Sequence, residues 1–449
     1  MPEPKLGESR TALDIAEIIA SRRFARFQLG VLLLCGLVLF AAGFITQVMP
    51  AVGPALARSL SVAPGALGPI YSFGGYGTLL GILVLGPVAD WIGRKPVLVG
   101  SLLVCAIFTF SCIWAQSVTQ FAVLRFVAGL GLGGVVPSTL ALAAEYMPKR
   151  HRATHTLLAW YGFAIGAGVA GPVASYTLVG HRWPVVFVFG GLMPVVLLPL
   201  VWAGLPESLL ILIRRGEREN VAIRAGLIRI SRRYDRLRVS EFMTSEPAER
   251  GVPVLLLFRQ GRALITALLW ILFFMGLMTI FFVNAWLPTV LKSTELSDRA
   301  ATNIAAVVQV GGMLGGLVVS LLAERFNRFL AVGGAFVLGA LSIAAMGMFS
   351  NTLVVAIVVF LVGLFALGAQ NAATAIAAAV YPTAMRATGV GWALGLGRNG
   401  QLISPTIGGL LVTLKWEANH LLYLVALPAF VAAAAAIAIA FSGRRFGDE

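Results

Sequence analysis

The sequence predicts an all-α integral membrane protein, with twelve transmembrane helices in two six-helix bundles. Of its 449 residues, 59% are hydrophobic and 12% are charged, and the mean hydropathy is +0.90. A soluble domain carries about 25% charged residues, so this composition does not suit a surface in water. A membrane-spanning helix needs about 20 apolar residues, and the chain has room for twelve. The third observation is an internal repeat that divides the chain in two.

Twelve apolar stretches of spanning length follow one another, with a polar gap after the sixth. The first group covers residues 27–50, 66–89, 97–116, 119–145, 154–179 and 183–204. The second covers residues 263–291, 301–323, 329–349, 352–380, 387–414 and 419–441.

The basic residues predict the sidedness of these helices. With the N-terminus inside, 27 of the 34 Lys and Arg residues fall in cytoplasmic segments, five fall in outer loops, and Arg125 and Arg398 lie within spans. Basic residues collect on the cytoplasmic side of membrane proteins, so both termini are expected there. In a soluble protein a net charge of +15 would suggest nucleic acid; here topology accounts for it, and no nucleic-acid partner is expected.

The predicted organisation follows from the spans. It comprises a cytoplasmic N-terminal segment (1–26), a first bundle (27–204), a basic cytoplasmic loop (205–262), a second bundle (263–441) and a tail (442–449). Residues 11–26 are amphipathic and predict an interfacial helix, and the long loop is expected to be partly helical. We expect a multi-pass monomer in the bilayer of a bacterial inner membrane.

No cofactor or metal is expected. Cys35, Cys105 and Cys112 lie in apolar stretches without the spacing of a zinc site or a disulfide framework, which indicates core thiols. The four histidines lie in loops or near span ends; His155, at the inner end of its span, is the one placed to shuttle a proton, although its position favours a side chain that simply faces the membrane interface.

Two loop motifs recur at one spacing. Asp90 precedes Glu324 by the same sequence distance as Arg152 precedes Arg386, and each of these arginines lies within a Pro-x3-Arg-Ala-Thr stretch. A single ungapped offset indicates duplication, which is typical of alternating-access transporters with a site between two repeats. A carboxylate in such a loop can cap or pair with a helix end. The residues expected to act in gating are Gly86, Asp90, Gly93, Arg94, Lys95, Glu145, Arg152, Glu324, Arg328 and Arg386.

These motifs resemble the major facilitator superfamily, whose signature loop is similar to residues 86–95. Residues 124–148, the Leu205-Pro206-Glu207-Ser208 stretch and residues 386–398 resemble the aromatic acid/proton symporter family. The resemblance implies transport of benzoate-like or other small organic acids. One departure matters: the acidic pair of the family's first helix aligns with Ala42 and Ile45, and all 19 acidic residues fall in loops or near helix ends. Proton coupling is therefore uncertain.

Two arginines are the leading candidates for binding an anion. A charge in hydrocarbon costs at least about 2.5–3.5 kcal/mol. Arg398 lies about twelve residues into its span, and its fork can hold a carboxylate; the alternative is a partnership with backbone carbonyls or with Asn399 and Gln401. Arg125, which has lost its expected acidic partner, either binds an anion or has a structural role.

Further polar and aromatic side chains within the spans are candidates for binding substrate. Each amide or hydroxyl can equally be hydrogen-bonding glue between helices. The candidates are Thr46, Gln47, Asn284, Gln309, Gln370, Asn371 and Asn399, with Tyr76, Tyr161 and Trp392 as aromatic walls.

The sequence therefore favours a secondary active or facilitative transporter of small organic acids, such as aromatic monocarboxylates. A multidrug or metabolite exporter of the same fold is the alternative, although exporters of cationic drugs usually need a buried acid. No nucleophile–base set or metal cluster supports an enzyme, and no long extension supports a sensor.

Overall fold

The structure is a computed structural model of the whole chain. It describes residues 12–14, 26–148, 152–177, 183–214, 241–243, 254–259, 262–292, 298–349, 351–377, 380–381, 385–414 and 416–442. The described part is almost entirely helical, as expected for a membrane-embedded chain in which each backbone group must be hydrogen-bonded internally.

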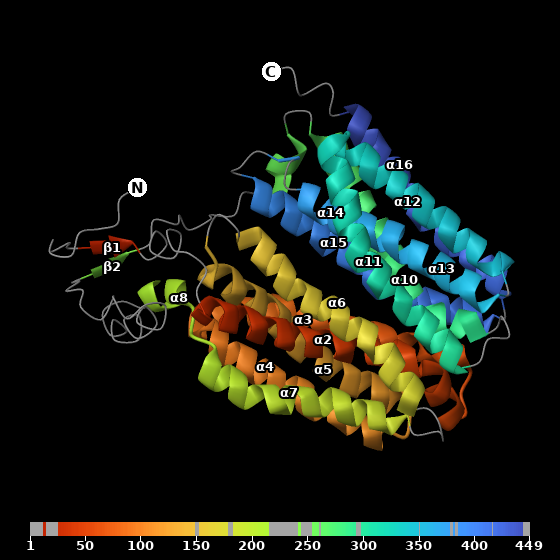
Figure 1. The fold of residues 1–449 in the computed structure, drawn as a ribbon, viewed down its shortest axis with the longest axis horizontal. Helices are drawn as coiled ribbons and strands as arrows, with labels where there is room; N and C mark the ends of the chain where they lie inside the picture. Colours follow the sequence, from red (N-terminus) through yellow and green to blue (C-terminus); the bar gives the residue numbers. More distant parts are fainter. Residues whose placement is uncertain are drawn as a thin grey trace.

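The helices form two groups (Figure 1). The first group contains α2 (Arg26–Ser59), α3 (Gly68–Ile92), α4 (Arg94–Ser111), α5 (Val118–Tyr146), α6 (Arg152–Thr177) and α7 (Pro184–Gly204), with short 3-10 turns η1 (Pro64–Leu67) and η2 (Cys112–Trp114). The second contains α10 (Ala263–Lys292), α11 (Asp298–Arg325), α12 (Arg328–Ala345), α13 (Thr352–Val362), α14 (Gly368–Ala377), α15 (Arg386–Thr413) and α16 (Ala418–Ser442). Turn η7 (Met346–Met348) follows α12, and a π-helical segment η8 (Gly363–Leu367) joins α13 to α14.

The expected membrane fold is confirmed. Within the described part, eleven helices are long and apolar enough to cross a bilayer. The remaining long helix, α15, has 28 residues, but Arg398, Asn399 and Gln401 interrupt its apolar stretch. This helix is thus the one that carries the leading candidate for anion binding.

The element boundaries differ from expectation in two places. Helix α2 continues nine residues past the expected end at residue 50, with Pro50 and Pro54 inside it, because neighbouring helices can satisfy the backbone groups that a proline frees in a membrane. The helix expected over residues 11–26 is wrong at Ala12–Asp14: these residues form strand β1, whose backbone pairs in parallel with β2 (Glu241–Met243), while residues 15–25 lie outside the described part.

The long loop is partly helical, as expected. Within its described residues, α8 (Leu209–Arg214) and the 3-10 helix η6 (Val254–Phe258) are helical.

The internal repeat is visible in how the helices pack. A Cβ on Gly77 would meet the carbonyl oxygen of Phe126, and one on Gly311 would meet that of Phe360. Likewise, Gly81 lies against Leu130 as Gly315 lies against Leu364. Each residue is separated from its counterpart by the offset of the two loop motifs, so glycine lets the same helices approach closely in both groups.

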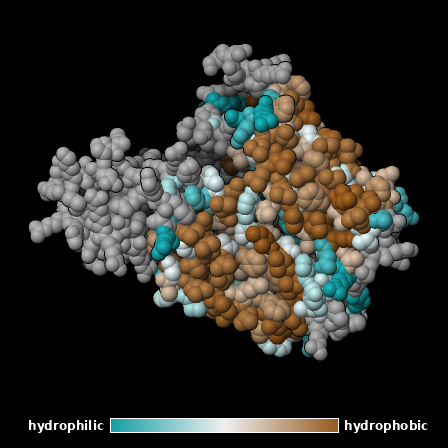
Figure 2. Space-filling view, in the orientation of Figure 1, coloured by the Kyte–Doolittle hydropathy of each residue, from teal (hydrophilic) through white to brown (hydrophobic). Residues whose placement is uncertain are grey.

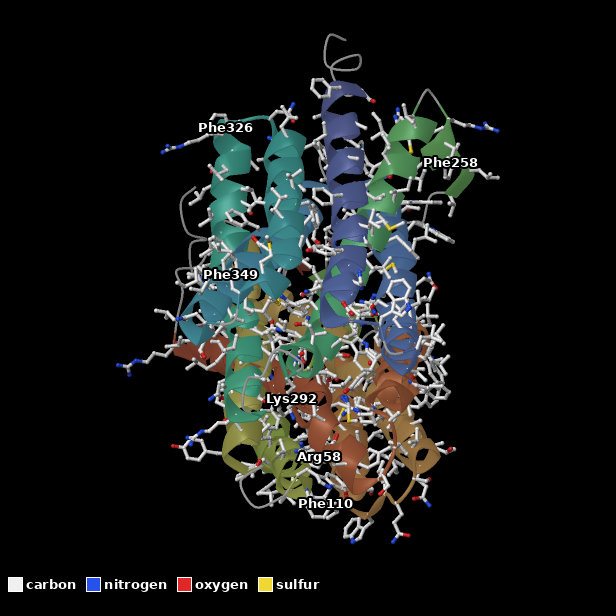
Figure 3. All side chains as sticks on the ribbon, turned by 90° about the vertical axis from the view of Figure 1, so that its right-hand side faces the viewer. Arg58, Phe110, Phe258, Lys292, Phe326 and Phe349 are labelled. Atoms are coloured by element: carbon white, nitrogen blue, oxygen red, sulfur yellow. The ribbon has the colours of Figure 1, made fainter. Side chains whose placement is uncertain are left out.

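The two groups meet at the end where α2 and α10 finish. The side chains of Ser72 and Thr406 are hydrogen-bonded at 2.7 Å, and the Tyr71 ring packs edge-on against Trp286 at 5.4 Å. Gly65 and Gly68 lie against the backbone of Gly409. Figure 3 is viewed from this side and labels Arg58 and Lys292, which lie at the ends of α2 and α10. We call this end the closed end.

The outer surface suits lipid. Figure 2 shows apolar side chains over a broad face of both helix groups, with polar residues near the helix ends. Leu83, Trp202 and Leu321 are each more than 60% exposed, which would be costly in water over so large a surface. The surface therefore fits a multi-pass membrane protein.

The glycine contacts at the closed end yield a first prediction. Gly409→Leu should force α15 away from η1 and α3, because its Cβ would reach the Gly65 carbonyl and Gly68. Spin labels at Leu60→Cys and Leu414→Cys should report a longer distance population. Gly334→Leu is the matched control, since a Cβ there meets no atom within 4 Å. Unchanged distances in Gly409→Leu would contradict the prediction.

Candidate functional site

Arg398 lies on the face of α15 that points toward the first helix group. Leu402, one turn later, packs against Gly75, and Thr406 follows on the same face and bonds Ser72. Arg398 lies one turn before Leu402 in the chain and is therefore further from the closed end than either contact. Its side chain is partly buried and forms no hydrogen bond or ion pair with another described residue.

Neither of the alternative side-chain partners, Asn399 and Gln401, bonds Arg398 in the described part. The amide of Asn399 donates to the carbonyl oxygens of Gly395 and Leu396, at 3.4 and 3.3 Å within its own helix. The backbone carbonyl of Gln401 accepts from the Ser404 hydroxyl at 3.4 Å, and no hydrogen bond joins the Gln401 side chain to Arg398 in the described part. The N–H donors of the Arg398 guanidinium therefore have no acceptor among the described residues.

Three amide side chains form a cluster between the groups. The Gln309 amide on α11 donates to Oδ1 of Asn284 on α10 at 2.9 Å. The Gln47 amide on α2 donates to the backbone carbonyl of Asn284 at 3.3 Å. Residues far apart in sequence are brought together here, and this amide cluster joins three helices beside the closed end.

A small cavity adjoins the amide cluster. Its enclosed volume is about 10 Å³, room for about one water molecule, and it is lined in part by Gln47, Gly171, Pro288 and Thr302. Pockets for small molecules usually measure about 300–1,000 Å³. This cavity is therefore too small for an aromatic acid, and we assign it to imperfect packing at the closed end.

Arg125 is buried inside the first helix group. Its side chain is 6% exposed, and its Nε and Nη1 atoms have no hydrogen-bond partner. The backbone of Gly74 lies against the guanidinium, and no acid of the described part forms an ion pair with it. Ala42 and Ile45, which align with the acidic pair of the resembling family, are themselves packed in the apolar core. A buried cation without a counter-charge is costly, so this position needs an explanation beyond packing.

The other candidate side chains are dispersed. Thr46 bonds the Ala42 carbonyl of its own helix at 2.8 Å, and the Asn371 amide donates to the Gly312 carbonyl at 3.4 Å. Tyr76 packs edge-on against Phe73 in α3, at 6.3 Å between ring centres.

Two further aromatic candidates lie on helices at the boundary between the groups. Trp392 stacks on Trp270 of α10 at 6.2 Å between ring centres. Tyr161 is seven residues before Gly168, hence on the same face of α6, and Gly168 lies against Gln309. Tyr161 therefore faces the second group.

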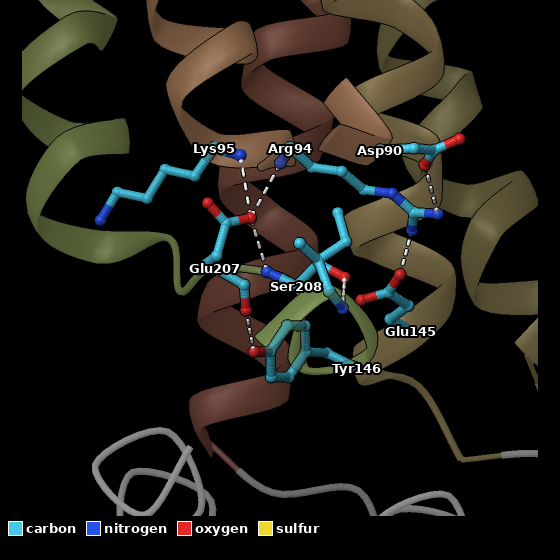
Figure 4. A network of polar contacts seen from close by, with 8 residues as sticks. Asp90, Arg94, Lys95, Glu145, Tyr146, Glu207 and Ser208 are labelled. Atoms are coloured by element: carbon cyan, nitrogen blue, oxygen red, sulfur yellow. Dashed lines mark hydrogen bonds and ion pairs between the residues drawn. The ribbon is translucent and has the colours of Figure 1, made fainter. Parts of the chain in front are cut away.

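The signature loop sits in a polar network at the opposite end of the first group (Figure 4). Gly93 separates α3 from α4 with φ +111°, a value that favours glycine. The carboxylate of Glu207, after α7, accepts from the backbone N–H groups of Arg94 and Lys95 at 2.9 and 3.2 Å. It thus caps the N-terminus of α4, and a side chain at Gly93 would collide with it.

The Arg94 side chain ties three helices together. It is ion-paired with Glu145 of α5 and, at 3.7 Å, with Asp90 of α3. Glu145 is mostly buried, with 10% of its side chain exposed, whereas Asp90 is 62% exposed. The hydroxyl of Tyr146 donates to the Glu207 backbone carbonyl at 2.5 Å, which joins this pair to the α4 cap.

The second copy of the loop is built differently. Asn327, which corresponds to Gly93, caps α12 with its own side chain by accepting from the N–H groups of Phe329 and Leu330 at 3.1 and 3.2 Å. Glu324 and Arg328 are exposed, and neither forms an ion pair with another described residue. The network is thus specific to the first repeat.

The remaining gating candidates are at helix ends or edges. Arg152 and Arg386 begin α6 and α15, but their side chains lie outside the described part. Gly86 borders open space, and the Lys95 ammonium lies 5.5 Å from the centre of the Trp202 ring.

Sequence reasoning missed one residue of this network. Glu207 was noted only as part of a family-like stretch, and its capping role depends on α7 and α4 lying side by side. An acid between a span and a short helix was the available signal, but its partners are distant in sequence.

Two helix groups that meet along a central boundary form the architecture of a membrane transporter. Comparison with known proteins agrees with this assignment. The family model of the Major Facilitator Superfamily matches residues 32–397 and 269–448, so the chain belongs to this superfamily. A bacterial homologue of the human lysosomal transporter Spinster, solved in an inward-facing and unoccupied conformation, has the same fold, with a TM-score of 0.63 at 16% identity over 94% of this chain and 98% of that one.

Several curated relatives extend over nearly the full length. The chain is 35% identical to a gallate transporter of Pseudomonas putida, over 95% of both sequences. It is 33% identical to the 4-hydroxybenzoate transporter PcaK of Acinetobacter baylyi, over 96% of this chain and 94% of the relative. A benzoate transport protein of Acinetobacter baylyi is 29% identical over 90% and 87% of the two chains.

The network in Figure 4 predicts a ranking of stabilities. Glu145→Gln should lower the free energy of unfolding by about 3 kcal/mol, because it leaves Arg94 without its buried partner. Asp90→Asn should cost about 1 kcal/mol or less, since an exposed ion pair contributes little. Thermal unfolding of the purified variants measures both. Equal losses, or a larger loss for Asp90→Asn, would be inconsistent with the network as described.

Proposed function

We propose that this protein transports aromatic monocarboxylates in their ionised form by alternating access between its two helix groups, with Arg398 as the group that holds the carboxylate. The observation that carries the proposal is a partly buried guanidinium without a partner in the described part, on the face of α15 that points toward the first helix group. The relatives named for gallate, 4-hydroxybenzoate and benzoate support the substrate class.

Electrostatics favours an anion at this position. An arginine cannot readily lose its proton to avoid the cost of burial, so it needs a counter-charge. The acids of the described part lie in loops or near helix ends, which leaves the bound substrate to supply that charge. A planar carboxylate matches the guanidinium fork with two parallel hydrogen bonds.

The amide cluster is suited to the other end of such a substrate. The side-chain oxygens of Gln47 and Gln309 accept no hydrogen bond from the described residues. A ring hydroxyl is a donor and can use them. Tyr161, on the face of α6 that points to the second group, supplies an aromatic wall between the cluster and Arg398.

The transport cycle requires that the closed end opens. Loop 60–63 and the end of α10 at Lys292 lie at this end, on the side that the charge distribution predicts to be outside the cell. In this reading the described conformation is shut toward the outside, and glycine contacts between η1, α3 and α15 form the outer gate.

Coupling is proposed to be uniport or anion exchange. Ala42 and Ile45 cannot titrate, and both are buried in the apolar core. The membrane potential opposes inward movement of an anion by about 2.3 kcal/mol per charge per 100 mV. An exchanger avoids this cost because a second anion leaves as the first enters.

The role of Arg398 is tested by equilibrium binding. Arg398→Ala should weaken binding of 4-hydroxybenzoate to the purified protein by about 10- to 100-fold, the loss expected for a charged hydrogen bond. Arg398→Lys should recover only part of the affinity, because a single ammonium lacks the fork. Arg325→Ala, at the exposed end of α11, is the control and should bind normally. Wild-type affinity in folded Arg398→Ala would rule out this assignment.

The proposed coupling is tested in proteoliposomes. Vesicles loaded with labelled substrate should release it faster into medium with unlabelled substrate than into medium with only a proton gradient. The physical reason is that no titratable group lies at the aligned positions of α2. Several-fold accumulation driven by a pH gradient alone, with stoichiometric proton entry, would point instead to a symporter, and Glu145 and His155 would be the first residues to replace.

A further inference from the structure

A π-helical segment interrupts one span in the second helix group. Segment η8 covers Gly363–Leu367 between α13 and α14, whereas the corresponding stretch of α5, 129–133, is ordinary α-helix. A π-helix uses more residues per turn than an α-helix, and such segments are frequent at functional sites. The first repeat, which has no π segment at this place, shows how the second would pack without one.

Before the π segment, the two spans are in the same register. Phe126 and Phe360 oppose Gly77 and Gly311, respectively. Gly129 lies against the carbonyl of Gly74, as Gly363 lies against that of Val308. The members of every matched pair are separated by the same sequence offset, which is the offset of the repeat.

Within the π segment the register changes by one residue. Gly133 lies against Gly81, but the residue that lies against Gly315 is Gly368, which is one position further along the chain than the repeat offset predicts. A match of Gly134 to Gly368, which that offset alone suggests, is therefore wrong in space: Gly134 faces Ser101 and Leu85 instead.

A second pair of contacts gives the same result. Gly131 lies against Cys105, and Gly339, the counterpart of Cys105, lies against Ala366, again one position beyond the repeat offset. The shift therefore falls between Leu364 and Ala366, which makes Phe365 the additional residue.

The shift changes the surroundings of two amides. Gln370 takes the place that Val135 has in the first group, a core position that is 1% exposed there. Gln370 is itself 4% exposed, and neither its Oε1 nor its Nε2 has a hydrogen-bond partner. Asn371 takes the place of Val136 and is exposed. In the unshifted register, Gln370 would take the half-buried place of Val136.

We infer that Gln370 is a positioning residue of the transport cycle, moved between a buried and an accessible place by a one-residue register change at η8. When the π segment becomes α-helical, α14 turns by about 100° relative to α13. The Gln370 amide then leaves the apolar core and gains access to partners. The same turn moves the end of α14, from which the chain continues toward α15 and Arg398.

Each register has one unfavourable feature that the other lacks. Such a balance allows an element to adopt two states. The π register leaves a buried amide unpaired, which is unfavourable. The same register preserves the close fit of Gly368 against Gly315 and of Ala366 against Gly339. A polar side chain at a core position, without a partner, is difficult to explain if the segment stays in this register throughout.

The inference rests on alternating access from the proposed function, but not on which acid is carried. The direct test is cysteine accessibility, with Cys35, Cys105 and Cys112 replaced. A small maleimide should label Asn371→Cys and should label Gln370→Cys at least tenfold more slowly. In the Gly409→Leu background, which disfavours the described conformation, labelling of Gln370→Cys should rise at least tenfold.

Transport variants provide an independent readout. Deletion of Phe365 makes the span continuously α-helical while keeping residues 366–377 in their present places, so it should retain binding of 4-hydroxybenzoate and lose at least tenfold in exchange rate. Gln370→Leu, which suits the buried place, should slow exchange several-fold. Thr374→Val, one turn later in α14, should not, because the Thr374 hydroxyl only bonds the Gln370 carbonyl of its own helix.

Each result has one meaning. Unchanged protection of Gln370→Cys in both backgrounds would overturn the inference, as would wild-type exchange by a folded Phe365 deletion. If that deletion fails to fold, the labelling result decides. If the wild-type protein neither binds nor exchanges aromatic acids, the proposed substrate fails, whereas labelling still tests the register change.

Discussion

The cost of placing a charge in hydrocarbon shapes this protein more than any other term. The chain keeps its acids in loops or near helix ends, yet retains Arg125 and Arg398 within spans. Each unpaired charge of this kind is unfavourable by several kcal/mol unless a counter-charge is present. In the function proposed above, an anionic substrate supplies the counter-charge that the described part of the chain does not provide to Arg398.

Duplication supplied the scaffold, and the groups proposed above to act in transport lie where the two repeats differ. Glycine contacts pack α3 on α5 as they pack α11 on α13, with one sequence offset as far as the π segment. The positions that correspond to Arg125 and Arg398 in the other repeat are Val359 and Ala164, both apolar. The Arg94 network, the Asn327 cap and the π segment likewise occur in one repeat only within the described part. A symmetric scaffold with asymmetric polar groups is suited to rocking about a central site.

Composition and spacing were sufficient to predict the membrane fold, the repeat and the two arginines, because burial in lipid restricts sequence strongly. The end of α2 was not predictable, since proline stops helices in water but is tolerated inside this one. The pairing of Ala12–Asp14 with Glu241–Met243 and the cap from Glu207 depend on contacts between segments that are distant in sequence. The π segment was hidden for a different reason: the loop motifs before and after it keep the same sequence offset, so the extra residue within it does not show as an insertion.

The central claim is that Arg398 binds an ionised carboxylate without help from a titrating acid of the protein. The most direct test is the pH dependence of 4-hydroxybenzoate binding to the purified protein. The affinity should be constant from about pH 8 down to about pH 5 and should fall only as the substrate carboxylate itself is protonated, near the usual pKa of about 4 for such groups. An affinity that rises several-fold as the pH falls from 8 to 6 would show that a protein group takes up a proton on binding, and would contradict the account.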